Sequence, residues 1–350
     1  MVRVKSPLKH IFRTRIYFLI EILILIFGIY FLLLLIQLLP IIIEPNSILF
    51  GPLYFMLRAI FLVLGIMIFL YVANFALQSK RKLIVEEISS TKNFIKLFSI
   101  SKSNFKYQLM YGFLLLFLVF IPLDFLQYLV LPKTLDFLSM LLTFSVSNSY
   151  LLTPYFTFLV SVLIIQFSIA LHEESFVRGF LTNRGSDYVP KMSAVIISSF
   201  FWGLQHFAYI LHPLGRLVPL SFLLNWFIQA FIIGIILALF ILRKRWIFPV
   251  IFSHAVNNII TAHTIWNHVQ GNGFTQLAIL VYTPLILISL TLFIWQFSRI
   301  KESLLNGLKE FKSYFSNDKS IKETSMDKII RIMLDFLFGL IIFAVAIIVL

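Results

Sequence analysis

The sequence predicts an all-α fold, a polytopic membrane helix bundle of about nine transmembrane helices with a cytoplasmic N-terminus. Composition is the first reason: 60% of the 350 residues are hydrophobic, 13% are charged and 40 are phenylalanine, a balance foreign to soluble domains. The second reason is that long continuous apolar runs recur along the chain. Such runs fit membrane helices and not the alternating strands of a barrel.

Nine apolar runs are long enough to cross a bilayer. They cover residues 16–43, 51–77, 109–131, 154–176, 192–211, 221–242, 246–263, 274–297 and 329–350. Lys and Arg residues gather in the connections on one side, whereas the opposite connections hold only Lys133 and Arg216. The positive-inside rule therefore predicts a cytoplasmic N-terminus and an external C-terminus.

The net charge of +14 is explained by these topology signals, so we expect no nucleic-acid partner. The chain has no cysteine, which excludes disulfides, a thiolate nucleophile and cysteine-ligated zinc. Its richness in Phe, Ile and Lys fits an AT-rich bacterial genome. The expected location is the bacterial cytoplasmic membrane, with the protein integral and multi-pass.

Two connecting segments, 79–108 and 298–328, have mixed charge and are partly amphipathic. In the first, Phe94, Leu97 and Phe98 recur at helical spacing. We expect both segments to lie on the membrane surface. The alternative is that they dock a membrane-protein partner.

A first polar group ends the run that begins near residue 154. Glu174 and Arg178 are four residues apart and share a helix face, in the order that favours an ion pair. Glu173 points elsewhere, and an unpaired carboxylate at membrane depth suits a general base acting on water. The simpler interpretation is that all three residues anchor the helix end at the cytoplasmic interface.

Two later runs carry polar pairs at the same spacing. Trp202 and His206 are four residues apart, as are His254 and Asn258, so each pair forms a stripe on its own helix. A single membrane histidine usually makes a helix-to-helix hydrogen bond. Two of them on separate helices favour a site, in which Glu173 and one histidine activate water while His254 and Asn258 donate to an oxyanion. Proton relay or transport is a competing use.

Three motifs, Glu-Glu-x-x-x-Arg at 173–178, aromatic-x-x-x-His at 202–206 and His-x-x-x-Asn at 254–258, resemble in order those of one family. This is the CAAX prenyl endopeptidase and bacteriocin-processing (CPBP, or Abi) family of intramembrane proteases, which includes the type II CAAX prenyl endopeptidases. The resemblance divides the chain into a catalytic core at 154–263 and accessory transmembrane regions at 1–153 and 264–350.

The resemblance implies an endopeptidase in which Glu173 activates water with His206, and His254 and Asn258 bind the oxyanion. Glu174, Arg178 and Trp202 are supporting residues. Family members are often described as metalloproteases, and we leave the metal open. If a divalent ion such as zinc is bound, its expected ligands are Glu173, His206 and His254.

This chain departs from the family at Trp202, where phenylalanine is usual; the aromatic packing should survive. The expected substrate is a membrane-associated peptide or protein. Because the composition indicates a bacterial source, we do not favour prenylated CAAX proteins among these substrates. A non-enzymatic membrane scaffold or regulator, for example in cell-envelope biogenesis or signalling, is the rival function. A proton-coupled transporter is the third alternative.

Several other charged or titratable residues lie in or near the apolar runs. Glu21, Arg58 and Asp335 are expected to snorkel or pair near helix ends, Asp335 with Arg331. Asp124 lies well inside its run and has two interpretations, a structural hydrogen-bond acceptor or a residue lining a polar cavity. His172 is expected to lie at the membrane interface.

Overall fold

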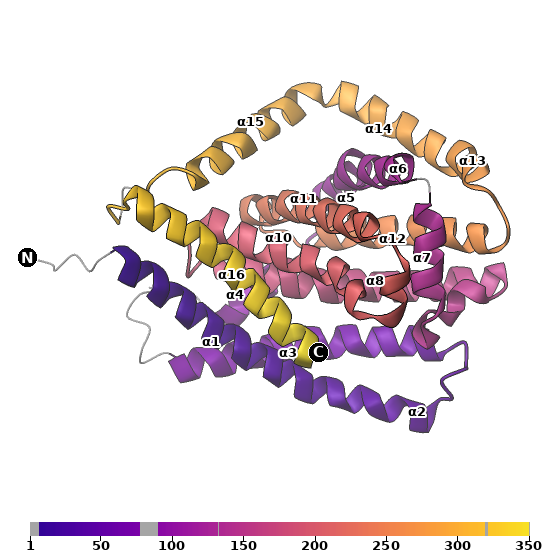
Figure 1. The fold of residues 1–350 in the computed structure, drawn as a ribbon, viewed down its shortest axis with the longest axis horizontal. Coiled ribbons are helices and arrows are strands. Elements are labelled where there is room, and N and C mark those ends of the chain that lie inside the picture. The colour runs from indigo at the N-terminus through magenta and orange to yellow at the C-terminus, as the bar shows by residue number, and fades with distance from the viewer. Residues whose placement is uncertain (1–6, 78–89, 132, 319–320, 350) are drawn as a thin grey trace, which may run out of the picture.

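The computed structural model describes residues 7–77, 90–131, 133–318 and 321–349, and every regular element in those ranges is helical (Figure 1). Eight helical segments of this part are long and apolar enough to span a membrane. They are Pro7–Ile42, Phe50–Leu77, Phe105–Val130, Tyr155–Gly185, Lys191–Leu211, Leu220–Lys244, Phe274–Trp295 and Ser325–Val349. The chain is therefore an integral membrane protein with an all-α fold, as predicted.

The spans are built from labelled helices. In chain order these are α1 (Pro7–Leu33) with α2 (Leu39–Ile42), α3 (Phe50–Leu77), α5 (Phe105–Leu115) with α6 (Ile121–Val130), α8 (Tyr155–Glu174) with α9 (Asn183–Gly185), α10 (Lys191–Phe207), α11 (Leu220–Lys244), α13 (Phe274–Leu277) with α14 (Thr283–Trp295), and α16 (Ser325–Val349). Three spans contain π-helical turns, at Leu116–Phe120, Ser175–Thr182 and Ala278–Tyr282.

The ninth predicted run, 246–263, forms α12 (Phe248–Val269). It is long enough to span, but its polar side chains, including His254, Asn257 and Asn258, make it less apolar than the eight others. Helix α12 packs against α8 and α5. Eight apolar spans and this polar helix agree with the predicted total of about nine.

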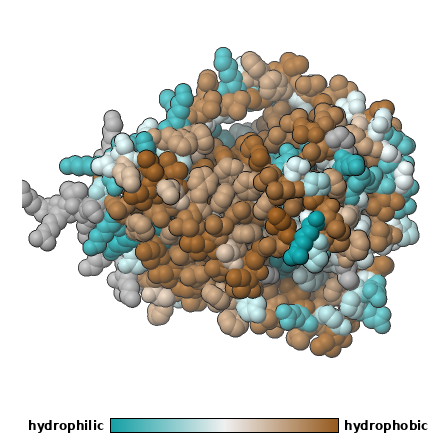
Figure 2. All heavy atoms as spheres, in the orientation of Figure 1, coloured by the Kyte–Doolittle hydropathy of each residue, from teal (hydrophilic) through white to brown (hydrophobic). Residues whose placement is uncertain are grey.

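Successive spans reverse direction along the bundle, and basic connections gather at the end where the N-terminus lies (Figure 1). In the space-filling view a broad apolar band separates hydrophilic groups at the two ends (Figure 2). This arrangement is what a bilayer requires of a polytopic protein. The cytoplasmic orientation of the N-terminus stays a prediction.

Two short elements close one end of the bundle where the sequence indicated only a connection. Helix α7 (Thr134–Thr143) and the 3₁₀ turn Val146–Leu152 contact each other and also α12.

The close approach of α10 to α11 depends on a glycine. A Cβ at Gly203 of α10 would lie 3.2 Å from the Phe227 carbonyl oxygen of α11. Small residues permit such contacts between membrane helices.

The two amphipathic segments differ. In α4 (Ser90–Lys96) and just after it, Phe94 and Leu97 are only 2% and 1% exposed, and the Ile247 amide donates to the Leu97 carbonyl. The prediction of a membrane-surface position is therefore wrong for this part, because the bundle itself covers its apolar face. Residues 78–89 of the segment lie outside the described ranges.

The second segment contains α15 (Phe297–Tyr314). Leu304, Leu305 and Leu308 are exposed there, and the helix arches away from the body of the bundle (Figure 1). An exposed apolar face beside a charged face is what a surface-lying helix presents. The membrane-surface position stays a prediction for this segment.

Buried ion pairs connect helices away from the centre. Arg15 of α1 pairs with Asp335 of α16 at 2.5 Å, and Arg331 pairs with Glu323 at 2.8 Å. The predicted pair of Asp335 with Arg331 is therefore wrong, because each residue finds its partner on a different segment. The Tyr314 hydroxyl also donates to Asp335 at 2.9 Å; burial and this carboxylate raise the pKa of Tyr314.

Candidate active site

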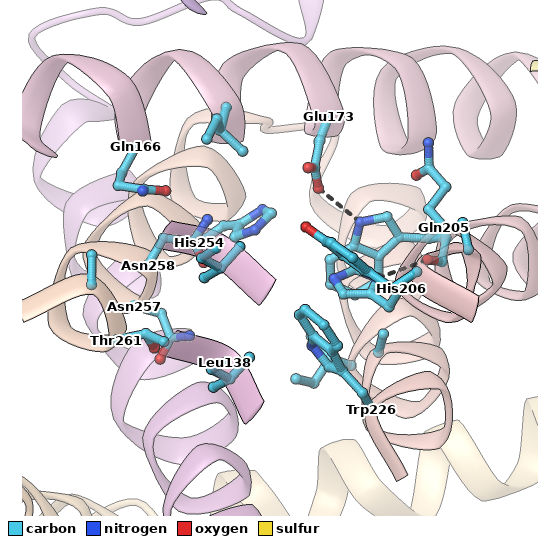
Figure 3. Close-up of a pocket in the computed structure, with 18 of the residues that line it drawn as sticks. Leu138, Gln166, Glu173, Gln205, His206, Trp226, His254, Asn257, Asn258 and Thr261 are labelled. Atoms are coloured by element: carbon cyan, nitrogen blue, oxygen red, sulfur yellow. Dashed lines mark hydrogen bonds between the residues drawn. The ribbon is translucent and has the colours of Figure 1, made fainter. Parts of the chain in front are cut away.

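A cavity of about 560 Å³ lies within the bundle. Its walls come from α3, α6, α7, α8, α10, α11, α12 and α16 and from the turns that join them. Glu173, His206, His254 and Asn258 all line it, and Figure 3 shows them facing one space from three helices. The structure thus brings together the four residues that the sequence nominated as catalytic.

Glu173 lies one residue before the end of α8, where the helix continues as the π-helical turn Ser175–Thr182. Such turns are frequent at functional sites. The Trp202 indole Nε1 donates to Glu173 Oε2 at 2.9 Å (Figure 3). One carboxylate oxygen is therefore held by a side-chain donor on α10. A phenylalanine at position 202 could not supply that hydrogen bond.

His206 is oriented by its own helix. Its Nδ1 lies 2.9 Å from the Trp202 carbonyl oxygen, and its ring packs edge-on against Trp202 and Trp226, with centroids 5.0 and 5.3 Å apart. A carbonyl only accepts, so Nδ1 carries the proton of this bond. In the neutral ring, Nε2 is then left as an acceptor.

His254 is oriented from the opposite side of the cavity. Its Nδ1 lies 2.7 Å from Glu174 Oε1, and its ring stacks on Phe120. With Nδ1 donating to the carboxylate, a second hydrogen bond, from Nε2 to an oxyanion, requires the doubly protonated ring. The negative charge of Glu174 then lies next to the positive ring.

Glu174 and Arg178 form the ion pair that their spacing predicts. Arg178 Nε lies 3.2 Å from Glu174 Oε2, and both side chains are fully buried. The guanidinium also covers the Trp202 ring, with Cζ 4.1 Å from its centroid. Glu174 therefore connects Arg178 to His254, and Arg178 supports the tryptophan that binds Glu173.

Asn258 follows His254 by one turn on α12 and faces the same cavity (Figure 3). Its neighbour Asn257 points to Asp124 of α6, donating at 2.9 Å. Asp124 also accepts from Gln229 at 2.8 Å and from Thr261 at 3.0 Å. Both interpretations of Asp124 thus hold, because it accepts hydrogen bonds from two other helices and lines the cavity.

Two cavity residues were assigned elsewhere by the sequence. His172 was expected at the interface and Arg58 near a helix end, yet both line the cavity. His172 directly precedes Glu173, and its Nδ1 bonds the Ser168 carbonyl at 3.0 Å. Arg58 belongs to α3, in the part of the chain that the sequence predicts to be an accessory transmembrane region. The sequence did contain a signal for Arg58, because a charged residue inside an apolar run often belongs to a functional site.

The expected metal ligands were tested against this geometry. Glu173, His206 and His254 share the cavity, but in the described part of the chain no three such side chains are grouped closely enough to hold an ion. The residues as placed do not form a metal-ligand set, and no catalytic step is derived through a metal.

Comparison with known families agrees with the motifs. Residues 155–260 match the family model described as type II CAAX prenyl endopeptidase Rce1-like. The match begins at the start of α8 and ends within α12, so it contains all four nominated catalytic residues. The predicted family resemblance is thereby confirmed. No curated protein and no solved structure matches the chain.

Proposed function

We propose that the Rce1-like domain at residues 155–260 makes this chain a glutamate-dependent intramembrane endopeptidase. It would hydrolyse a peptide bond in a membrane-associated peptide or protein, in the bacterial cytoplasmic membrane. The observation that carries the proposal is the convergence of Glu173, His206, His254 and Asn258 on one cavity inside an apolar bundle. Ionisable groups at membrane depth are costly and so mark function.

In the first step a water molecule lies between Glu173 and the scissile carbonyl. Glu173 takes one proton from this water, and the hydroxide oxygen forms a bond to the carbonyl carbon. Trp202 holds one carboxylate oxygen at 2.9 Å, which leaves the other free to accept the proton. His206 Nε2, the free acceptor of that ring, accepts a hydrogen bond from the same water and fixes its orientation.

The carbonyl oxygen becomes an oxyanion in the tetrahedral intermediate. His254 Nε2, in the doubly protonated ring, and the Asn258 amide donate to this oxygen. In the second step the C–N bond breaks, Glu173 returns its proton to the leaving amine, and a carboxylic acid and an amine are released. Glu174 lies 2.7 Å from His254 Nδ1 and keeps the ring directed at the oxyanion.

The proposal is tested with Glu173→Gln, which keeps the shape and the hydrogen bond from Trp202 while removing the base. We expect peptide fragments released by cells expressing the wild type to fall about 10²- to 10⁴-fold in the variant, measured by quantitative mass spectrometry of peptides and new N-termini. Glu302→Gln, at an exposed acid of α15, is the matched control and should release wild-type amounts.

The rival function predicts another pattern. If the protein acts as a scaffold, Glu173→Gln complements a deletion strain fully and the fragment profile is unchanged. That result, with equal amounts of protein in the membrane, would reject the peptidase. Loss of fragments in Glu173→Gln but not in Glu302→Gln supports it.

A further inference from the structure

Arg58 differs from the other deeply placed arginines in the described part of the chain. Arg15, Arg178, Arg184 and Arg331 are buried, and each pairs with a carboxylate within 3.2 Å. Arg58 makes no ion pair in the described ranges. Its one hydrogen bond runs from Nη1 to the Tyr54 hydroxyl at 3.3 Å, and its buried Nε has no partner among the described residues.

Arg58, which has no counter-ion among the described residues, lines the catalytic cavity. An arginine without a counter-ion inside an apolar bundle is costly, and such residues usually mark a binding function. The other charged residue of the accessory wall, Asp124, accepts three hydrogen bonds from uncharged side chains and forms no ion pair with Arg58. The cavity therefore contains a cationic site with unused donors.

Helix register places this cation at about the level of Glu173. Helices α3 and α8 run in the same direction and pack along each other (Figure 1). A Cβ at Gly51 of α3 would lie 3.5 Å from Ile165 of α8. Arg58 follows Gly51 by about two turns, as Glu173 follows Ile165.

We propose that Arg58 is a substrate-binding residue that holds a carboxylate of the peptide close to the cleaved bond. A guanidinium fork matches a carboxylate with two parallel hydrogen bonds. The carboxylate can be the C-terminal α-carboxylate of a short tail or an acidic side chain a few residues from the cleaved bond. The inference rests on the proposed peptidase function, and it adds a specificity determinant on α3, outside residues 155–260.

Binding can be measured apart from cleavage. Trp202 and Trp226 line the cavity, so their fluorescence reports occupancy. The probes are one acetylated apolar tripeptide as its free acid, the same peptide as its amide, and an amide whose last residue is glutamate. Each peptide is titrated into full-length Glu173→Gln protein in nanodiscs. The same titrations are made with Glu173→Gln combined with Arg58→Gln, with Arg58→Lys or with Arg216→Gln. Arg216 is an exposed arginine, so its variant is the matched control.

We expect the free acid to bind at least about 10-fold more tightly than the plain amide, and Arg58→Gln to remove this preference. Arg58→Lys retains part of it and Arg216→Gln all of it. A glutamate amide that binds as well as the free acid identifies an acidic side chain as sufficient, whereas one that binds like the plain amide identifies the terminal carboxylate.

Equal binding of the plain amide and of both carboxylate-bearing peptides to protein with Arg58 intact, or no binding of either carboxylate-bearing peptide, overturns the proposal without reliance on any Arg58 variant. So does a preference that survives Arg58→Gln. Because binding is measured in protein lacking the base, these results are independent of hydrolysis. If wild-type protein releases no fragments in cells while the acid preference depends on Arg58, the peptidase proposal fails and the carboxylate site stands.

Discussion

The polar groups between α1 and α16 and those around the cavity are arranged in different ways. Between α1 and α16, Arg15 and Asp335 pair at 2.5 Å, and Arg15 also reaches Ser193. Tyr314 donates to the same carboxylate. Around the cavity, Glu173 is held through one oxygen by Trp202, and His206 keeps one ring nitrogen free. Charges in the first region satisfy one another, whereas those in the second retain capacity for a ligand.

The difference separates structural from functional polarity in a membrane protein. A charge placed in an apolar bundle needs a partner, and pairs such as Arg184 with Glu21 at 2.8 Å supply it. Removing one member should therefore harm folding. Removing a cavity group should instead harm chemistry or binding and leave the fold largely intact. Glu174 belongs to both classes, since it pairs with Arg178 and orients His254.

The largest effect is expected at the α1–α16 pair. Asp335→Asn leaves the Arg15 guanidinium buried without a counter-ion, which should lower the free energy of unfolding by about 3 to 5 kcal/mol. Unfolding of purified protein in detergent measures this. The double variant Arg15→Met with Asp335→Leu should recover most of the loss, because the apolar pair leaves no uncompensated charge. A loss below about 1 kcal/mol for Asp335→Asn would contradict the structural role.

Glu174→Gln should affect both properties. The amide oxygen can still accept from His254, but the charge that faces Arg178 and a doubly protonated His254 is lost. We expect a fall in kcat on the order of 100-fold, with a smaller change in KM. Activity and thermal unfolding are measured on the same sample. An unchanged kcat would show that Glu174 does not support catalysis, even if the variant were less stable.

The positions of the helices and the residues that share a helix face could be predicted from the sequence, because both depend on local patterns. Long apolar runs fix where helices lie, and i, i+4 spacing fixes which residues share a face. The pair Glu174–Arg178 followed from that rule. The same rule failed for Arg331 and Asp335, because partners on other segments, Glu323 and Arg15, lie closer.

The rest of the site depends on contacts between distant segments. Arg58 and Asp124 lie on α3 and α6, outside the region of the motifs, and nothing in their local sequence indicates which cavity they face. The Trp202–Glu173 bond joins residues 29 positions apart. Sequence predicted an aromatic ring supporting the histidine, but the direction of its indole N–H is set by how α10 packs on the π-helical turn that continues α8.

Trp202→Phe isolates that hydrogen bond. An aromatic ring is kept, while the donor to Glu173 is removed, so we expect kcat to fall about 10- to 30-fold, which corresponds to roughly 1.4 to 2 kcal/mol. The matched control is Trp266→Phe, which removes a similar 2.9 Å bond to the Thr153 carbonyl away from the cavity. That control should lower stability and leave kcat unchanged. Equal effects of the two variants on kcat would mean that the Trp202 bond supports only the fold.

Tyr314→Phe is the mildest change on the structural side. It removes one donor to Asp335, at a cost of about 1 kcal/mol in the free energy of unfolding. Because the pKa of Tyr314 is raised above 10.0 in the folded protein, its contribution is fully present below that pH and is lost as the pH rises toward the folded-state value. The stability difference between wild type and Tyr314→Phe, measured from pH 7 to 11, should therefore be constant up to about pH 10 and then decrease.

The control is Tyr107→Phe, at an exposed tyrosine, which should have the same stability as the wild type at every pH. A difference for Tyr314→Phe that grows above pH 10 would show that the hydroxyl does not act as a donor to Asp335.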